Sequence, residues 1–149
     1  MWAKRHGFPS PIKDVTNGFE EVYAAMLRGI SPPDILIVPI GTGATFLGLA
    51  KEVSRKRWKT LIVGVGEMEK DTIADKIKGP VFYWKQIKRY LQKGHEYVRV
   101  TNKEIKIAIK ITKNILPCEP TAAAAFAALF HIKDKQKRIF VVNTGKGKL

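Results

Sequence analysis

The chain has 149 residues, of which 45% are hydrophobic and 27% charged, and its formal net charge is +14. This length and composition are typical of one globular domain with a hydrophobic core. No stretch approaches the roughly 18 uninterrupted apolar residues of a membrane helix, and the opening MWAKRHGFPS lacks the apolar segment of a signal peptide. Cys118 is the single cysteine, so no internal disulfide can form. We therefore expect a cytoplasmic protein with no membrane segment.

The positive charge has three competing explanations. Basic chains attract nucleic acids, lysine-rich surfaces are common in proteins of hot-living organisms, and an acidic partner chain would also match. The lysines are spread over predicted helix faces, which favours a solvated surface. Segment 82–94, FYWKQIKRYLQKG, interleaves aromatic and basic residues. An amphipathic helix with aromatics in the core explains it as well as nucleic-acid binding does, so nucleic acid is the least favoured partner.

The first half of the chain alternates between helix and strand patterns. Segment 18–30 has apolar residues at helical spacing and a glycine at its end, which predicts a helix. Segment 35–40, ILIVPI, is short and wholly apolar, as in a strand buried on both faces of a parallel sheet. A helix should follow over 45–56, and 60–67, TLIVGVGE, should be a second buried strand.

The second half continues the alternation. A short helix is predicted over 71–79 and an aromatic helix over 82–94. Segment 96–101, EYVRVT, alternates in polarity, which predicts a strand near the edge of the sheet. Segment 119–133 should be a helix with a proline in its first turn, and 138–144, RIFVVNT, should be the last strand.

The helix after the third strand has an unusual pattern. Thr101 and Glu104 have the spacing of a capping box at its start. One stripe of the helix is lysine, at positions 103, 106, 110 and 113, and nearly everything else is Ile, Ala or Leu. We expect this helix to be covered on both sides.

The alternation as a whole predicts an α/β fold with three layers, in which helices cover both faces of a mostly parallel sheet of about four strands. Such sheets bind ligands outside the carboxyl ends of their strands. Two glycine-containing turns, 41–45 and 144–147, fall at such ends.

The first turn, in ILIVPIGTGATFLGLAKEV (35–53), has the composition of an anion site. Gly41 and Gly43 permit a tight turn and a close ligand approach. The helix beginning near Thr45 offers free N–H groups and its positive dipole end, and Thr42 adds a second hydroxyl. Phosphate is the natural occupant. The pattern is not a P-loop, since no G-K-[ST] follows, and it is not G-x-G-x-x-G, because position 46 is Phe. A strand-to-helix turn that merely needs glycine is the alternative.

Three motifs in order point to a family. IGTGATFLGLAKEV…LIVGVGEME is similar to the G-T-G-G-T loop and following strand of cysteine synthases, with Ala44 in place of a glycine and Gly66 before the Glu. VRVTNKEIKIAIKITKNILPCEPTAAAAFAAL and IFVVNTGKGKL are similar to threonine synthases and threonine dehydratases. Over residues 15–148 the chain thus resembles the carboxyl-terminal half of threonine synthase-like pyridoxal-phosphate enzymes of the tryptophan-synthase-β fold (fold type II).

The resemblance implies roles for particular residues. The loop Gly41, Thr42, Gly43, Ala44 and Thr45 would hold the cofactor phosphate through backbone N–H groups. The hydroxyl of Thr144 would face the pyridine nitrogen and leave it unprotonated, which favours elimination and replacement at the β or γ carbon of amino acids. The alternative for Thr144 is a residue that caps its own turn. We expect Glu119 to be either a helix N-cap or a chemical group, and Cys118 to be a buried small residue.

The lysine that forms a Schiff base with the cofactor in this family has no counterpart in context. SPIKD (10–14) and SRKR (54–57) echo its S-x-K-x-R motif, but neither Lys13 nor Lys56 lies in the expected surroundings. The family's asparagine loop for the substrate carboxylate is also absent. The resemblance therefore makes 1–149 a single domain equivalent to the large cofactor domain, with a loose terminus at 1–14. The histidines lack partners at metal-ligand spacing, and we expect no metal site.

A half-enzyme would expose apolar surface, and such a surface normally finds a partner. We therefore expect a homodimer, or a complex with a separate amino-terminal half that supplies the lysine. The expected function is a truncated or split threonine synthase-like protein, inactive alone. The alternatives are one subunit of a two-chain lyase and a non-catalytic phosphate-binding or regulatory module. Its ligand would be pyridoxal phosphate, bound non-covalently at most, or else phosphate or sulfate in the same loop.

Overall fold

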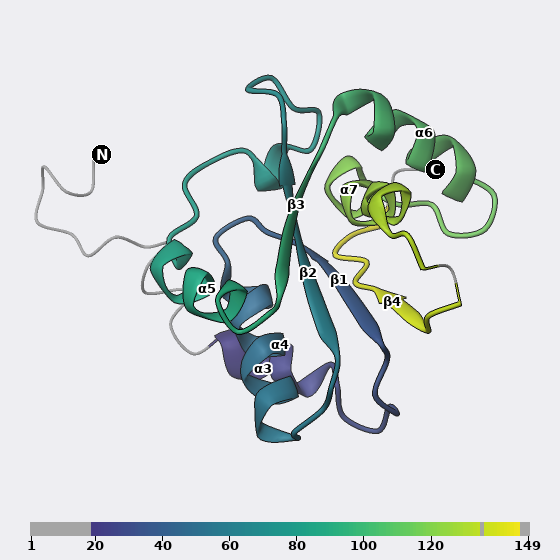
Figure 1. Cartoon of the computed structure of the whole chain (residues 1–149). Helices are drawn as coiled ribbons and strands as arrows, with labels where there is room; N and C mark the ends of the chain where they lie inside the picture. Colours follow the sequence, from purple (N-terminus) through teal and green to yellow (C-terminus); the bar gives the residue numbers. More distant parts are fainter. Residues whose placement is uncertain (1–18, 135, 147–149) are drawn as a thin grey trace, which may run out of the picture.

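The computed structural model describes residues 19–134 and 136–146. Its centre is a sheet of four parallel strands in the order β3-β2-β1-β4 (Figure 1). The strands are β1 (Ile35–Pro39), β2 (Leu61–Glu67), β3 (Glu96–Val100) and β4 (Ile139–Val141). The predicted α/β fold is confirmed, and β3 lies at the sheet edge as expected. The predicted loose terminus, 1–14, lies outside the described residues.

Helices cover both faces of the sheet (Figure 1). On one face lie α3 (Phe19–Ala25), α4 (Ala44–Arg55) and α5 (Trp84–Leu91). On the other lie α6 (Asn102–Thr112) and α7 (Pro120–Ala127), which continues into the 3-10 turn η2 (Ala128–His131). A further 3-10 turn, η1, spans Asp75–Ile77. Within the described part of the chain, no helix is long and apolar enough to cross a bilayer.

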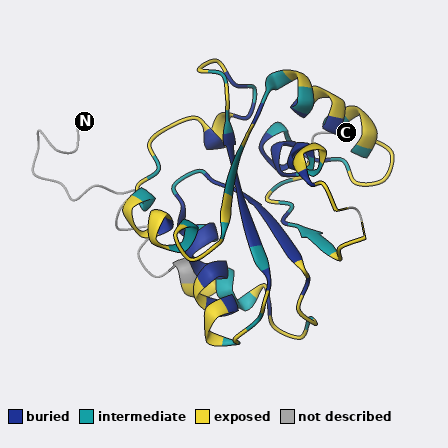
Figure 2. Cartoon of the chain, in the orientation of Figure 1, coloured by how far each residue is buried: buried dark blue, intermediate teal, exposed yellow. Residues whose placement is uncertain are grey.

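The sheet separates two hydrophobic cores, because successive side chains of a strand point to opposite faces. Ile37 and Val63 are fully buried in the core under α6 and α7. Val38 and Phe46 are fully buried in the core under α3, α4 and α5. All five residues of β1 are buried, and Figure 2 shows β1 and most of β2 as the buried centre of the molecule. The all-apolar run at 35–40 is thus the central strand that its composition predicts.

Two predicted elements are shorter than expected. The helix predicted over 71–79 is only the η1 turn. Its backbone amides have side-chain acceptors instead, since Asn102 accepts a hydrogen bond from Ile73 N–H (2.8 Å) and Thr72 Oγ1 accepts one from Ala74 N–H (3.2 Å). The strand predicted over 138–144 pairs in full only over Ile139–Val141. It ends in a turn in which Asn143 Oδ1 accepts a hydrogen bond from Gly145 N–H (3.1 Å).

Helix α6 begins as predicted but is covered on one side only. The capping box is confirmed, with Glu104 N–H on Thr101 Oγ1 (3.2 Å) and Thr101 N–H on the Glu104 carboxylate (2.7 Å). Ile105 is buried toward the sheet and α7. Ile107 and Ile111 are 41% and 60% exposed. The prediction of cover on both sides is therefore wrong for this chain alone, because nothing in the described chain packs on the outer face.

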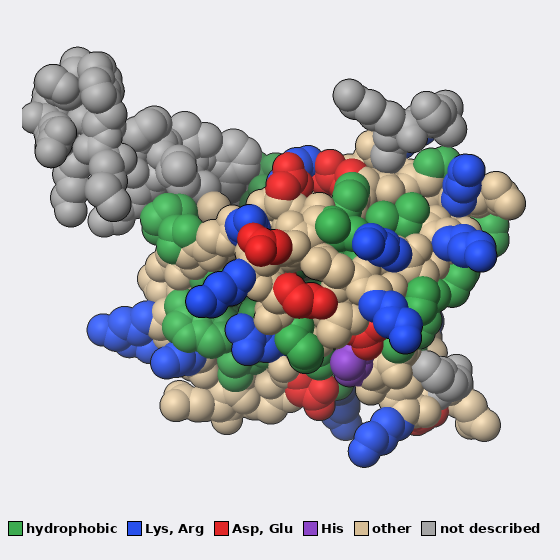
Figure 3. Space-filling model, turned by 90° about the horizontal axis from the view of Figure 1, so that it is seen from above, with side chains coloured by type: hydrophobic (Ala, Val, Ile, Leu, Met, Phe, Trp, Pro, Cys, Tyr) green, Lys and Arg blue, Asp and Glu red, His purple; other side chains and the backbone are tan. Residues whose placement is uncertain are grey.

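The basic residues form no single block on the face shown in Figure 3. There, Lys and Arg side chains alternate with acidic and hydrophobic ones. In the aromatic segment, Ile87 is fully buried, and Tyr83, Trp84 and Tyr90 pack against the core beside it. Segment 82–94 is thus the amphipathic alternative realised as α5.

Candidate functional site

The glycine turn joins the carboxyl end of β1 to the start of α4. Gly43 is the N-cap of α4 with φ +100°, a left-handed conformation that favours glycine. Its carbonyl accepts the first helical hydrogen bond, from Leu47 N–H (3.0 Å). Thr42 Oγ1 lies 3.4 Å from Ala44 N and accepts from it. The sequence therefore makes the helix begin one residue earlier than predicted, directly after the second glycine.

Five backbone amides at this turn have no hydrogen-bond acceptor within the described chain. They belong to Gly41, Thr42, Gly43, Thr45 and Phe46. The first amides of a helix lack intrahelical acceptors by geometry, and the helix dipole adds a partial positive charge at the same place. Unused donors at a helix start are the chemical requirement for binding an anion such as phosphate.

Both glycines are also required by packing. A Cβ on Gly41 would lie 2.5 Å from the carbonyl oxygen of Lys76, which is backbone and cannot move aside cheaply. A Cβ on Gly43 would lie 2.7 Å from Ile87 Cδ1 and 3.2 Å from Tyr83 Cβ. The segment carrying Tyr83 and Ile87 thus closes one side of the turn, and Tyr83 N–H donates to Thr42 O (3.2 Å). Packing therefore requires both glycines, and this requirement is compatible with anion binding at the same turn.

The other side of the turn opens into a cavity of about 260 Å³, which we call the loop cavity. Its lining residues come from five segments of the chain: Tyr23, Pro39, Gly41, Thr42, Gly43, Thr45, Lys76, Ile77, Thr121 and Thr144. Five of the six predicted site residues are among them. Ala44 is not; it is buried at 3% exposure. Its amide hydrogen bonds to Thr42 instead.

Strand order explains why these residues meet. The chain runs from β1 outward to β2 and β3, then returns to place β4 on the other side of β1. The order therefore reverses between β1 and β4, and the carboxyl ends of strands at such a switch point form the usual ligand crevice of α/β sheets. Residues 41–45 follow β1 and Thr144 follows β4, so the loop cavity lies at the switch point.

Thr144 is exposed, and its hydroxyl has no hydrogen-bond partner among the described residues. The side chain that caps this turn is Asn143, not Thr144. The Thr144 hydroxyl is therefore free to face a ligand in the loop cavity, whereas the turn-capping alternative is not realised.

Sequence reasoning missed Lys76 and Thr121, which reach the cavity from η1 and α7. Lys76 N–H donates to Thr121 Oγ1 (3.3 Å). The Lys76 ammonium contacts both carboxylate oxygens of Glu119, at 2.7 and 2.6 Å. Glu119 does occupy the N-cap position of α7, but its side chain makes no capping hydrogen bond. No local pattern signals this pair, because 43 residues separate its members.

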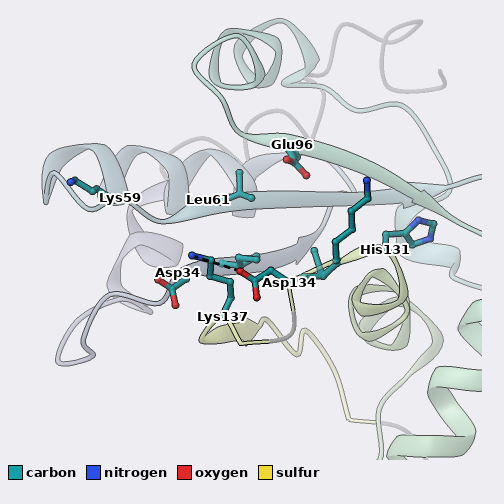
Figure 4. Close-up of a pocket in the computed structure, with 10 residues that line it drawn as sticks. Asp34, Lys59, Leu61, Glu96, His131, Asp134 and Lys137 are labelled. Carbon is teal, nitrogen blue, oxygen red and sulfur yellow. Dashed lines mark ion pairs between the residues drawn. The ribbon is translucent and has the colours of Figure 1, made fainter.

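A larger cavity, of about 610 Å³, lies at the amino ends of the strands, opposite the loop cavity (Figure 4). The first residues of three strands, Ile35, Leu61 and Glu96, help line it. Its ionic groups are of both signs, and Asp34 already accepts a hydrogen bond from Arg138 N–H (2.8 Å). It lies at the amino ends of the strands, away from the switch point, so it is not the favoured anion site.

Comparison with known proteins agrees with this assignment of the fold. The family model for pyridoxal-phosphate dependent enzymes matches residues 8–145. The chain belongs to this family. No curated protein sequence matches the chain.

Solved structures of this family share the fold. Serine racemase from Dictyostelium discoideum has a TM-score of 0.66 at 20% identity, covering 91% of this chain and 51% of that protein. Threonine deaminase from T.th. has a TM-score of 0.67 at 18% identity, covering 99% and 63%. Cysteine synthase from Entamoeba histolytica has a TM-score of 0.68 at 19% identity, covering 91% and 44%. The chain therefore spans about half the length of these proteins, and the fold-type-II resemblance is confirmed.

The family implies pyridoxal phosphate as the cofactor, and the residues present fit its phosphate group. Open amides, the hydroxyls of Thr42 and Thr45, and the ammonium of Lys76 are the donors that a phosphate requires. Of the two lysines that echo the Schiff-base motif, only Lys56 lies among the described residues, and it is not placed to link the cofactor. Lys56 Nζ donates to Leu27 O (2.9 Å), lies over the Trp58 ring and does not line the cavity. Lys13 lies outside the described residues.

Proposed function

We propose that this chain is the phosphate-binding half of a truncated or split threonine synthase-like enzyme. It holds the phosphate of pyridoxal phosphate non-covalently in the loop cavity and is inactive alone. One observation carries the proposal: at the switch point of a sheet from a pyridoxal-phosphate enzyme family, a cavity is lined by Gly41, Thr42, Gly43 and Thr45, whose amides have no acceptor among the described residues.

The roles of the residues follow from their atoms. The open amides of Gly41, Thr42, Gly43 and Thr45 would donate to phosphate oxygens, and the hydroxyls of Thr42 and Thr45 would add donors at the same point. Thr144 would offer its hydroxyl from the neighbouring strand end to the pyridine nitrogen, and a hydroxyl as the partner, unlike a carboxylate, would leave that nitrogen unprotonated. When bound, pyridoxal phosphate supplies an electron sink for amino-acid chemistry. Lys56 lies away from the loop cavity, and we assign Lys76, which lines it, to the phosphate rather than to a Schiff base, so we expect no turnover from the chain alone.

Thermal unfolding in the presence of anions tests this function. Inorganic phosphate should raise the midpoint by roughly 5–10 °C at a hundredfold excess over Kd, from the linkage of ligand to stability and the usual size scaling. Chloride at equal ionic strength is the control, because a chain of net charge +14 responds to any anion. Pyridoxine phosphate should protect, whereas pyridoxine should not. These probes lack the aldehyde that would react with surface lysines.

A matched pair of variants locates the effect. Thr45→Val removes a hydroxyl from the loop cavity and should weaken phosphate binding. Thr112→Val removes a hydroxyl that donates to Ala108 O within α6 (3.0 Å) and should leave binding unchanged. Protection by phosphate no greater than by chloride, or an equal loss in both variants, would refute the proposal.

A second candidate is one subunit of a two-chain lyase, and the exposed outer face of α6 favours it. Ile107 and Ile111 leave an apolar surface on the described chain, and the chain covers about half of its structural neighbours. A second copy, or a separate amino-terminal half that supplies the lysine, is the partner we propose. Sedimentation equilibrium distinguishes these from a monomer. Elimination activity that appears only on addition of the second chain would establish the two-chain lyase.

The remaining alternative is a non-catalytic module for phosphorylated ligands. It shares the loop cavity but needs nothing from a pyridine ring. Equal affinity for inorganic phosphate and pyridoxine phosphate would favour this module, while tighter binding of pyridoxine phosphate favours the cofactor site. Thr144→Ala should reduce affinity for pyridoxine phosphate and leave that for inorganic phosphate unchanged if the hydroxyl faces the ring.

A further inference from the structure

Lys76 is held at the loop cavity by its backbone. Its N–H donates to Thr121 Oγ1 (3.3 Å), and its carbonyl oxygen packs against Gly41, where a Cβ would lie only 2.5 Å away. The following residue, Ile77, is buried at 2% exposure and fixes the turn. The backbone of Lys76 is thus locked between α7 and the glycine turn, while its side chain is 59% exposed and free to change partner.

The side chain of Glu119 pairs with the Lys76 ammonium. Its carboxylate contacts Lys76 Nζ through both oxygens (2.7 and 2.6 Å). Its amide donates to Gly145 O (3.2 Å), one residue after Thr144. A Cβ on Gly145 would lie 2.4 Å from the carboxylate, so this glycine makes room for Glu119. The ion pair therefore joins η1 to the start of α7, beside the turn that carries Thr144.

Glu119 and a bound phosphate would compete for the ammonium of Lys76. Among the residues that line the loop cavity, Lys76 is the one with a cationic side chain. A partly exposed Lys–Glu pair contributes little to stability, because water and salt screen it. A phosphate dianion held by amides at a helix start is a stronger acceptor for the same ammonium. Exchange of the ammonium from Glu119 to the phosphate therefore costs little and adds a charge-assisted hydrogen bond to the ligand.

We propose that Lys76 is a phosphate-binding residue of this site and that Glu119 is its competing partner, so that the pair sets the affinity for phosphorylated ligands. This inference rests on the proposed phosphate site. It predicts that substitutions at Lys76 and at Glu119 change the affinity for phosphate in opposite directions. Removing the lysine charge weakens binding, whereas neutralising Glu119 strengthens it, because the ammonium is then no longer held away from the ligand. A purely structural ion pair predicts the same sign for both changes.

The test is the Kd for inorganic phosphate, and for pyridoxine phosphate, by titration calorimetry with the folded full chain. Lys76→Met should weaken binding about tenfold, as expected for loss of one hydrogen bond from a charged donor. Glu119→Gln should tighten it several-fold, and Lys76→Arg should restore most of the affinity. Salt should weaken binding more steeply for wild type than for Lys76→Met.

Lys78→Met is the matched control, because Lys78 pairs with Asp71 (3.6 Å) and does not line the cavity. Its binding should equal that of wild type. Circular dichroism confirms that each variant is folded. Binding by wild type with an unchanged Kd in Lys76→Met, or weaker binding in Glu119→Gln, would overturn the role of Lys76 and leave the phosphate site intact. No binding by wild type would overturn both.

Discussion

Replacing Gly43 by alanine tests the geometry on which the site depends. Gly43 has φ +100°, and a left-handed backbone costs a residue with a Cβ about 1–2 kcal/mol. The new methyl would also lie 2.7 Å from Ile87 Cδ1, 3.2 Å from Tyr83 Cβ and 3.3 Å from Val81 Cγ1. Overpacking of this kind costs about 1–3 kcal/mol. The sum is about 2–5 kcal/mol, or roughly 4–20 °C in the unfolding midpoint at this chain length.

Gly94→Ala is the matched control. Gly94 has the same φ of +100°, and nothing lies within 4 Å of its added Cβ. It should therefore lose only the conformational part, about 1–2 kcal/mol. Urea unfolding of the two variants separates the packing part as their difference. Gly43→Ala should also lose protection by phosphate, whereas Gly94→Ala should keep it.

A double-mutant cycle identifies the contact itself. Ile87→Val removes the Cδ1 methyl, the atom nearest to the new Cβ, and should alone cost about 0.5–1.5 kcal/mol. In the Gly43→Ala background the same change relieves the clash, so the double variant should be more stable than additivity predicts. Equal destabilisation by Gly43→Ala and Gly94→Ala, together with additive effects of Ile87→Val, would show that the turn does not pack under α5 as described.

Three further predictions concern other parts of the fold. Burial alone would raise the pKa of Glu104, but hydrogen bonds from Thr101 and the contact with His131 outweigh it and lower the pKa below 4.5. Glu104→Gln keeps an acceptor for the Thr101 amide but removes the negative charge at the helix start, which should cost about 0.3–1 kcal/mol near pH 7. Urea unfolding should show this difference disappearing as the pH falls below 4.5 through the folded-state pKa. Burial, with Lys93 nearby, lowers the pKa of His95 below 6.5, and its Nδ1 accepts a hydrogen bond from Ile62 N–H (3.2 Å). The His95 contribution is thus present above pH 6.5 and lost below it, so His95→Gln should flatten the stability profile below that pH; an unchanged profile would contradict this. Ile111→Ser, at a side chain 60% exposed on α6, should change monomer stability by less than about 0.5 kcal/mol. If the outer face of α6 binds a second copy, the same variant should weaken self-association in sedimentation equilibrium, and unaltered association would exclude Ile111 from the interface.

Local sequence determined the elements whose signals lie within a few residues. The all-apolar segment 35–40 became the interior strand β1, because a short run of this kind suits a strand buried on both faces. Thr101 and Glu104 placed the start of α6, since a capping box satisfies amides at fixed spacing. The glycines at 41 and 43 likewise marked the turn and its open amides. The resemblance in motifs, taken in order, indicated the pyridoxal-phosphate enzyme family.

Tertiary structure decided what depends on residues far apart in the chain. Periodicity carries no information on strand order, and it is the placement of β4 beside β1 that brings Thr144 to the glycine turn. Side chains from another element converted the predicted helix at 71–79 into a short turn, because Asn102 offers a backbone amide there an alternative acceptor. The contact of Lys76 with Glu119 exists only once η1 and α7 meet at the cavity. Each of these outcomes is a contact between distant segments, and such contacts are chosen by the packing of the whole chain rather than by the pattern of any one part.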